Sequence, residues 1–385
     1  MKKYLPIFLV IVAVLVLVAC ESMYMRTAKL AIRDEDDPDK AIENLQKEIE
    51  ANPGNADAYL FMSQIYGQYK EEYYTAYQYA QKALEADPGK EKEVNIIKLA
   101  TWSQLHNQGL EAIQALVEVD RLMNYIKTNV ILGQITEDEL SDLIKKNLGN
   151  EKLRNLLKLT SMTIDDLVKQ KDEYEKLRIN VINEAVLKIG QAHEIEPDSM
   201  ITFELLGDTY VRAGDIDKAL DVYLQIYDKD PESIFALNRI ATTYFNQGDY
   251  EKSVEYFLVL HNLEPQNIDW LYNVWVGEIK LGNIEAAMDF AKQSIAIDPS
   301  NKELLYNIAD MQFNQKDYTE AAIYYEKVVA VDPTELEALK YLCYCLSNTK
   351  NYTDIVIYAQ KWLDVEPDSA EAQQFLNLAK QMLNK

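Results

Sequence analysis

Six of the ten prolines in this 385-residue chain stand at equal intervals of 34 residues. They are Pro197, Pro231, Pro265, Pro299, Pro333 and Pro367. Chance does not space prolines so evenly, so this part of the chain repeats one structural unit five times in succession. Because proline lacks a backbone N–H and restricts the residue before it, each of these prolines marks the end of a helix.

Each interval holds two stretches whose apolar residues are three and four positions apart, which is typical of amphipathic helices. A polar break such as Ala213-Gly214-Asp215 separates the two stretches. Small side chains at one position allow two antiparallel helices to approach closely. This position lies ten residues after each proline and holds Gly207, Ala241, Ala309 and Cys343, with Trp275 as the exception. One pair cannot bury its own apolar face, so neighbouring pairs must stack.

This pattern resembles the tetratricopeptide repeat, whose period is 34 residues. The resemblance implies an all-α fold, a solenoid of antiparallel helix pairs interrupted by an irregular helical section. In that family the first helix of each pair lines a concave groove that binds a partner. By repeat position, the residues implied here are Phe235, Asn238, Phe245, Tyr272, Asn273, Tyr306, Asn307, Phe313, Lys340, Tyr341 and Tyr344. Aromatic rings beside side-chain amides suit an extended peptide. The alternative is that the 26 tyrosines of the chain reflect an AT-rich genome and mark no binding surface.

The charged residues of the implied groove and of the whole chain indicate which kinds of partner are favoured. The implied groove holds one isolated lysine, Lys340, among the carboxylates of Asp269, Glu303, Asp310 and Glu337. A neutral or basic peptide is therefore favoured over an acidic one. The whole chain has 39 basic and 63 acidic residues, a formal net charge of −24, which disfavours binding to nucleic acid.

The repeat continues upstream with irregular spacing. Pro53 and Pro88 are 35 residues apart, and we expect tetratricopeptide-like helices over residues 20–120, in which Lys90–His106 and Leu110–Met123 form a pair. No proline occurs between Pro88 and Pro197, and residues 121–180 are predicted to form an irregular helical section. Within it, helices are expected to start at Thr136 and Thr163, the second running past Ile189 for more than 25 residues. The regular array spans residues 181–367, and residues 368–385 form a capping helix.

The N-terminus has the three parts of a secretory signal. Two lysines follow Met1, an apolar run extends from Tyr4 to Ala19, and a small residue precedes Cys20. The run is shorter than the roughly 20 residues of a permanent membrane span. The sequence Leu17-Val18-Ala19-Cys20 resembles the lipobox of bacterial lipoproteins. This resemblance implies a cleaved signal peptide at residues 1–19, acylation of Cys20, and a lipid-anchored, extracytoplasmic protein of the bacterial envelope, on the periplasmic side or at the outer membrane. The alternative is an uncleaved signal anchor with an incidental cysteine.

No set of residues indicates catalysis, a cofactor or a metal. The three histidines, His106, His193 and His261, are far apart, and Cys343 and Cys345 lack the spacing of zinc ligands. The leading interpretation is a non-catalytic scaffold for protein–protein interactions, with a role in envelope, pilus or outer-membrane complex assembly. One alternative is a lipoprotein that binds a glycan or another small ligand. A second is an enzyme with an active site within residues 126–180.

Overall fold

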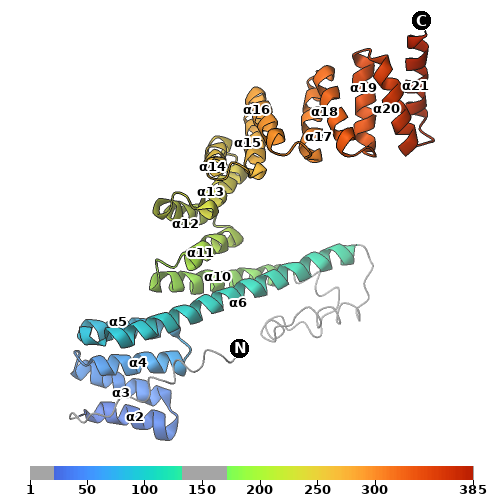
Figure 1. Ribbon diagram of the computed structural model, residues 1–385. Helices are drawn as coiled ribbons and strands as arrows, with labels where there is room; N and C mark the ends of the chain where they lie inside the picture. The colour runs from blue at the N-terminus through green and yellow to red at the C-terminus, as the bar shows by residue number, and fades with distance from the viewer. Residues whose placement is uncertain (1–20, 132–170, 385) are drawn as a thin grey trace. The chain divides into compact units, whose positions relative to one another are not determined.

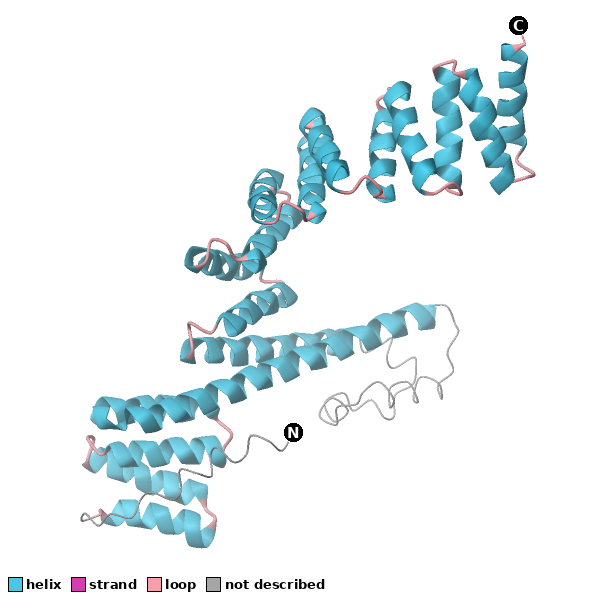
Figure 2. Ribbon diagram, in the orientation of Figure 1, coloured by secondary structure: helices cyan, strands magenta, loops and turns pink. Residues whose placement is uncertain are grey.

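The structure is a computed structural model that describes residues 21–131 and 171–384. Over these residues every regular element is a helix and no strand occurs (Figures 1 and 2). The chain divides into two compact units, Met1–Ile226 and Tyr227–Lys385, and each is treated by itself below.

The N-terminal unit begins with two antiparallel helix pairs. Helices α2 (Met23–Glu35) and α3 (Pro38–Ala51) form the first pair, and α4 (Ala56–Gln68) and α5 (Tyr73–Ala86) form the second. A short 3₁₀ turn, η2 (Pro88–Lys90), then leads into α6 (Glu91–Ile131), which packs against α10 (Lys171–Ile195). Helix α11 (Met200–Ala213) packs against α10, and α12 (Ile216–Lys229) runs across the boundary between the two units.

The C-terminal unit consists of further helices of nearly equal length that pack on their neighbours in chain order. They are α13 (Ile234–Gln247), α14 (Tyr250–Leu263), α15 (Ile268–Leu281), α16 (Ile284–Ile297), α17 (Lys302–Asn314), α18 (Tyr318–Val331), α19 (Leu336–Asn348), α20 (Tyr352–Val365) and α21 (Ala370–Leu383). Their buried faces form a core in which Leu305, Ile308, Leu339 and Trp362 are almost fully excluded from solvent.

The equally spaced prolines mark helix ends, as predicted. Each of the six stands two residues after the last residue of a helix, for example Pro299 after Ile297 and Pro333 after Val331. The turn inside each pair has its own signal. The residue 17 positions after each of the first five prolines has a positive φ: Gly214, Gly248 and Gly282 near 80°, Lys316 at 64° and Lys350 at 59°. This left-handed conformation ends the first helix, and glycine adopts it at the lowest cost.

At the small-residue position, ten residues after each proline, a glycine allows a close approach of the two helices of a pair, as predicted. A Cβ built on Gly207 would lie 2.4 Å from Cε1 of Tyr223, so only a glycine allows this ring so close to α11. A second close approach occurs at Gly277 on α15, two residues after the exception at Trp275. There, a Cβ built on Gly277 would lie 2.5 Å from Cγ2 of Val254. This contact joins α15 to the preceding pair, so it differs from the contact of Gly207 within a pair, and the Trp275 ring is buried in the core of the following helices.

The prediction of a helix pair at Lys90–His106 and Leu110–Met123 is wrong. Apart from Lys90, these residues belong to one continuous 41-residue helix, α6. Gly109, which lies between the two predicted helices, is buried inside α6, where a Cβ would lie 2.3 Å from Cγ1 of Ile189 on α10. Gly109 therefore permits close packing of two helices, and no proline or helix cap near it stops α6.

Side chains far apart in sequence join α5, α6, α10 and α11. The indole Nε1 of Trp102 donates to the hydroxyl of Thr202 over 3.0 Å, and Nδ1 of His106 lies 3.2 Å from the same hydroxyl. The hydroxyl of Tyr74 bonds to the carboxylate of Glu194. These contacts connect residues that are 96 to 120 positions apart, unlike the contacts between consecutive repeats.

Several predictions concern residues outside those that the structure describes. They are the signal peptide at 1–19, acylation of Cys20, and the helix starts at Thr136 and Thr163. Helix α10 covers the later part of the long helix predicted to run past Ile189. The predicted boundary at residue 120 falls inside α6, and that at residue 180 falls inside α10.

Candidate functional site

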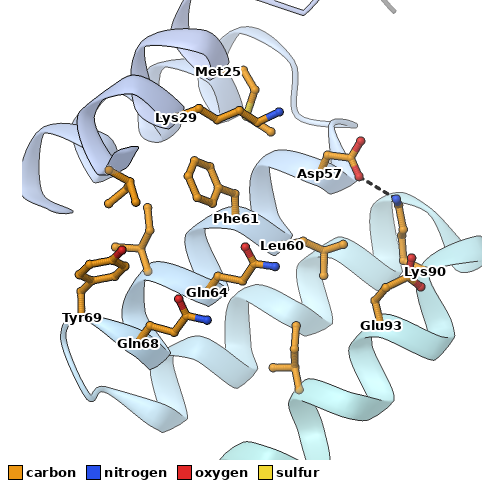
Figure 3. A pocket seen from close by; sticks show the side chains of 13 residues that line it. Met25, Lys29, Asp57, Leu60, Phe61, Gln64, Gln68, Tyr69, Lys90 and Glu93 are labelled. Atoms are coloured by element: carbon orange, nitrogen blue, oxygen red, sulfur yellow. Dashed lines mark ion pairs between the residues drawn. The ribbon is translucent and has the colours of Figure 1, made fainter. Parts of the chain in front are cut away.

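A pocket of about 370 Å³ lies on the N-terminal unit and is lined by α2, α4 and the start of α6 (Figure 3). Its lining residues come from the first helices of consecutive pairs. They are Met25, Lys29, Ile32, Asp57, Leu60, Phe61, Gln64, Ile65, Gln68, Tyr69, Lys90, Glu93 and Ile97. The volume is at the small end of the range of about 300–1,000 Å³ for ligand pockets. It suits a short segment of a chain.

The base of the pocket is apolar. Met25, Leu60, Ile65 and Ile97 are all at least nine-tenths buried, and Phe61 is half-buried over them. These residues are fixed by the packing of α2 and α6 on α4, so their positions are set by the core. A large apolar side chain that entered here would gain about 25 cal/mol for each Å² of apolar surface removed from water.

The charges around the pocket balance. Nζ of Lys90 lies 2.7 Å from Oδ1 of Asp57, and this contact raises the pKa of Lys90 (Figure 3). Lys29 forms an ion pair with Glu21, and Glu93 adds one further carboxylate to the lining. The pocket therefore presents no large excess of either charge to a ligand.

Two glutamines add hydrogen-bonding groups. Gln64 and Gln68 are one helical turn apart on α4, and their amides project toward the space that the lining residues enclose (Figure 3). A side-chain amide both donates and accepts, so it matches the N–H and C=O groups of an extended peptide backbone. The arrangement can thus hold a backbone with its amides and one apolar side chain on its base.

This pocket was not among the sites predicted from the sequence, although the repeat position contained the signal. The positions 4, 7, 8 and 11 residues after Pro53 are Asp57, Leu60, Phe61 and Gln64. All four line the pocket. The same positions were used to choose candidates in the regular array, and the irregular spacing after Pro88 obscured their meaning here.

The predicted groove residues lie on the first helices of the C-terminal unit. Phe235, Asn238 and Phe245 are on α13, Tyr272 and Asn273 on α15, Tyr306, Asn307 and Phe313 on α17, and Lys340, Tyr341 and Tyr344 on α19. All are half-buried except Tyr344, which is exposed. Their role as partner contacts stays a prediction.

Several of these side chains already have partners within the chain. Phe245 packs edge-on against Tyr250, and Arg239 lies over the ring of Phe235. Lys340 is not isolated, because its Nζ lies 2.9 Å from Oε1 of Glu337. Tyr344 contacts Phe375 through its ring, and its hydroxyl bonds to the carboxylate of Glu371.

Three of the predicted residues are brought together around one buried ring. The Tyr325 ring on α18 stacks on Tyr341 at 5.7 Å and meets Tyr306 edge-on at 5.6 Å. Phe313 meets Tyr341 edge-on at 5.1 Å. We call Tyr306, Phe313 and Tyr341, with the carboxylate of Asp310, the aromatic patch. Burial, Tyr341 and the nearby carboxylates of Glu337, Asp310 and Glu335 raise the pKa of Tyr306 to about 12.

The histidines His106 and His193 and the cysteines Cys343 and Cys345 take part in packing inside the chain. The ring of His193 stacks on Phe203 at 4.3 Å, and His106 lies against Trp102 and Thr202. Cys343 and Cys345 are both buried and unbonded, and burial raises the pKa of each thiol to about 12. Within residues 21–131 and 171–384, no group of three or more His, Cys, Asp or Glu side chains is arranged to hold a metal ion. Over the same ranges, no helix has the length and apolar content that crossing a bilayer requires.

Comparison with known families identifies the repeats. Residues 204–265 and 302–335 match two family models, both described as tetratricopeptide repeat. No curated protein matches the sequence. Together with the helical pairs described above, the family matches confirm the predicted fold class, an all-α solenoid of tetratricopeptide type.

Three solved structures that match this chain each cover less than half of it. YrrB, described as a TPR protein with an unusual peptide-binding site, is 17% identical, and the match covers 48% of this chain and 96% of YrrB with a TM-score of 0.37. A MamA protein is 20% identical, with 44% of this chain and 93% of MamA covered and a TM-score of 0.37. MamA from Desulfovibrio magneticus RS-1 is 15% identical, with 46% and 99% covered and a TM-score of 0.36.

Proposed function

We propose that this protein is a lipid-anchored, non-catalytic scaffold of the bacterial cell envelope that binds an extended peptide segment of a partner protein. Tetratricopeptide repeats support the general role of a protein-interaction scaffold, because stacked helix pairs present a long, regular surface to a partner. The anchor and the envelope location are supported by Leu17-Val18-Ala19-Cys20 and the preceding signal-like segment.

The observation that carries the proposal is the pocket on α2, α4 and α6. It combines the apolar base at Leu60 and Phe61 with the amides of Gln64 and Gln68, and its charges balance. A neutral peptide with one large apolar side chain matches all three properties. The side chain would be buried on the base, and the amides would satisfy the polar groups of the backbone beside it.

A selection experiment tests this function. Short random peptides displayed on phage are selected on the full-length chain in detergent micelles, and the dissociation constants of enriched peptides are measured by fluorescence anisotropy. We expect enriched peptides to share a large apolar residue. Phe61→Ala should weaken their binding by about tenfold or more, as for a central interface residue. Gln64→Ala combined with Gln68→Ala should weaken it by a similar factor, through loss of hydrogen bonds to the backbone.

The matched control is Gln114→Ala, which removes an exposed glutamine of α6 that does not line the pocket. It should leave the dissociation constants unchanged. If no peptide is enriched, or if Phe61→Ala and the double glutamine variant bind every enriched peptide as the wild type does, the proposed role of the pocket is wrong.

A further inference from the structure

The aromatic patch of the C-terminal unit has a different chemistry from the N-terminal pocket. Its rings come from α17 and α19 and are held in fixed orientations by the fully buried ring of Tyr325 beside them. Tyr306, Phe313 and Tyr341 are each half-buried, so part of every ring remains accessible. The face of an aromatic ring carries partial negative charge and attracts cations.

A carboxylate without a cationic partner lies among these rings. Asp310 is one turn after Tyr306 on α17, and among the described residues its carboxylate accepts a hydrogen bond only from the neutral amide of Asn314, at 3.2 Å. No lysine or arginine among the described residues forms an ion pair with it. The neighbouring Glu335 and Glu337 differ, because Lys302 lies 2.8 Å from the first and Lys340 lies 2.9 Å from the second. Asp310 is therefore the acidic group of this surface whose charge is not neutralised.

A similar combination occurs between α15 and α17. Glu303 on α17 is exposed and lies close enough to Tyr272 on α15 to contribute, after burial, to raising the pKa of that phenol. No ion pair to Glu303 occurs among the described residues. An aromatic ring and an unpaired carboxylate thus lie close together on the first helices of two consecutive pairs. The negative charge of this surface therefore extends beyond Asp310.

We propose that the surface formed by Tyr306, Asp310, Phe313 and Tyr341 binds an arginine side chain of a partner segment. A guanidinium group is planar and weakly hydrated, so it can lie on a ring face while its edge donates to a carboxylate in the same plane. The structure supplies both elements, the ring faces and the unpaired carboxylate of Asp310. An acidic side chain would be repelled by Asp310 and the ring faces, and a purely apolar one would leave the carboxylate unpaired.

This inference rests on the proposed function, since it assumes that the chain binds peptide segments, and it assigns the chemistry of a second contact. The test uses a synthetic pentapeptide with one central arginine flanked by glycine and serine. Its twin has citrulline at the same position, which has the shape of arginine without the charge. Binding of both to the full-length chain is followed by saturation-transfer NMR, which detects weak ligands.

We expect the arginine peptide to bind at least about fivefold more tightly than the citrulline peptide. Asp310→Asn keeps the size of the side chain and removes its charge, so it should weaken the arginine peptide by about fivefold and leave the citrulline peptide unchanged. Tyr306→Leu provides a second variant, which should weaken the arginine peptide through loss of the ring face while the thermal unfolding midpoint reports any loss of folding. The matched control is Asp289→Asn, which removes an exposed carboxylate on α16 from the same unit.

Equal binding of the two peptides would overturn the inference, because the positive charge of arginine would then contribute nothing to binding. An equal loss of affinity in Asp310→Asn and Asp289→Asn would also overturn it, because that result would indicate attraction by the overall negative charge alone. The two proposals fail separately. If peptides selected for the N-terminal pocket bind and respond to Phe61→Ala while the arginine peptide does not bind, only the assignment of the aromatic patch is wrong. If neither class binds, the proposed function fails with it.

Discussion

Gly109 on α6 and Ile189 on α10 are packed so closely that a Cβ at residue 109 would lie 2.3 Å from Cγ1 of Ile189. Alanine favours a helix by about 1 kcal/mol over glycine, yet we expect Gly109→Ala to destabilise the protein. Overpacking of a filled interface costs about 1–3 kcal/mol. The free energy of unfolding in urea, followed by circular dichroism, measures the difference.

Gly190 is the matched control, because it is the next residue on α10 and a Cβ there would meet nothing within 4 Å. Gly190→Ala should raise the free energy of unfolding by up to about 1 kcal/mol through helix propensity alone. If both alanine variants were stabilising, the close packing of α6 and α10 would be contradicted.

The turns of the C-terminal unit provide a second test. Lys316 has a φ of 64° at the repeat position where Gly248 has a φ of 82°. The left-handed conformation costs an L-residue about 1–2 kcal/mol of stability, which Lys316→Gly would recover. Part of this gain is lost, because glycine raises the conformational entropy of the unfolded chain. Lys316→Gly should therefore stabilise the chain by about 0.5–1 kcal/mol, and Gly248→Ala should destabilise it by a similar amount. The role of this position would be refuted if the free energy of unfolding in urea fell in Lys316→Gly and rose in Gly248→Ala.

Two tyrosines at one repeat position differ in their hydroxyl groups. The hydroxyl of Tyr223 donates to Oδ1 of Asp208 over 2.7 Å, whereas the buried hydroxyl of Tyr325 has no partner among the described residues. Tyr223→Phe should lower the free energy of unfolding by about 1 kcal/mol, the typical value of one hydrogen bond. Tyr325→Phe should leave it unchanged or raise it slightly, because the removed group has no bond to lose. Equal destabilisation in thermal melts of the two variants would show that Tyr325 also has a partner.

Acidification should weaken the junction of α6 and α11. Burial lowers the pKa of His106 from its ordinary value of 6.5, so the folded protein disfavours its protonated form. As the pH falls through 6.5, the unfolded chain takes up this proton more readily than the folded one, and stability decreases. We expect the unfolding midpoint of the wild type to fall further between pH 7.5 and pH 5.5 than that of His106→Gln. Parallel pH profiles for the two proteins would rule out His106 as the cause.

The lipid anchor is tested at Cys20. In a bacterial host, the wild type should incorporate labelled palmitate and fractionate with membranes, and Cys20→Ala should leave an unprocessed precursor without label. Replacement of Cys343 by alanine serves as the control, because this thiol is buried in the core. Continued labelling of Cys20→Ala would refute the assignment of the acylated residue.

The ends of the helices could be predicted from the sequence because their signals are local. Proline and a left-handed glycine act on the backbone within a few residues, so Pro299 and Gly248 mark the same turns in the sequence and in the structure. The continuity of α6 could not be predicted in this way. Gly109 serves a contact with Ile189, which is distant in sequence, and no local pattern distinguishes a packing glycine from one that ends a helix.

The candidate sites also depend partly on local signals and partly on contacts between residues that are distant in sequence. Repeat position was sufficient to place Tyr306, Phe313 and Tyr341 on the first helices, but the contacts of Tyr306 and Tyr341 with Tyr325 depend on a residue of a second helix. Prediction of the pocket in the N-terminal unit requires two pieces of information. The repeat position gives Phe61 and Gln64, but the packing of α6 could not be inferred from a single sequence.

The pairing of α6 with α10 has a consequence for synthesis of the protein. Each short helix pair finds its partner within a few dozen residues, and can fold soon after it leaves the ribosome. Helix α6 cannot, because Leu105 and Leu116 bury their side chains against residues of α10, and Trp102 meets Thr202 only 100 positions later. A nascent chain that ends before α10 therefore lacks the α10 residues that cover Leu105 and Leu116 in the folded protein, and exposed apolar surface of this kind favours aggregation until the missing helix emerges.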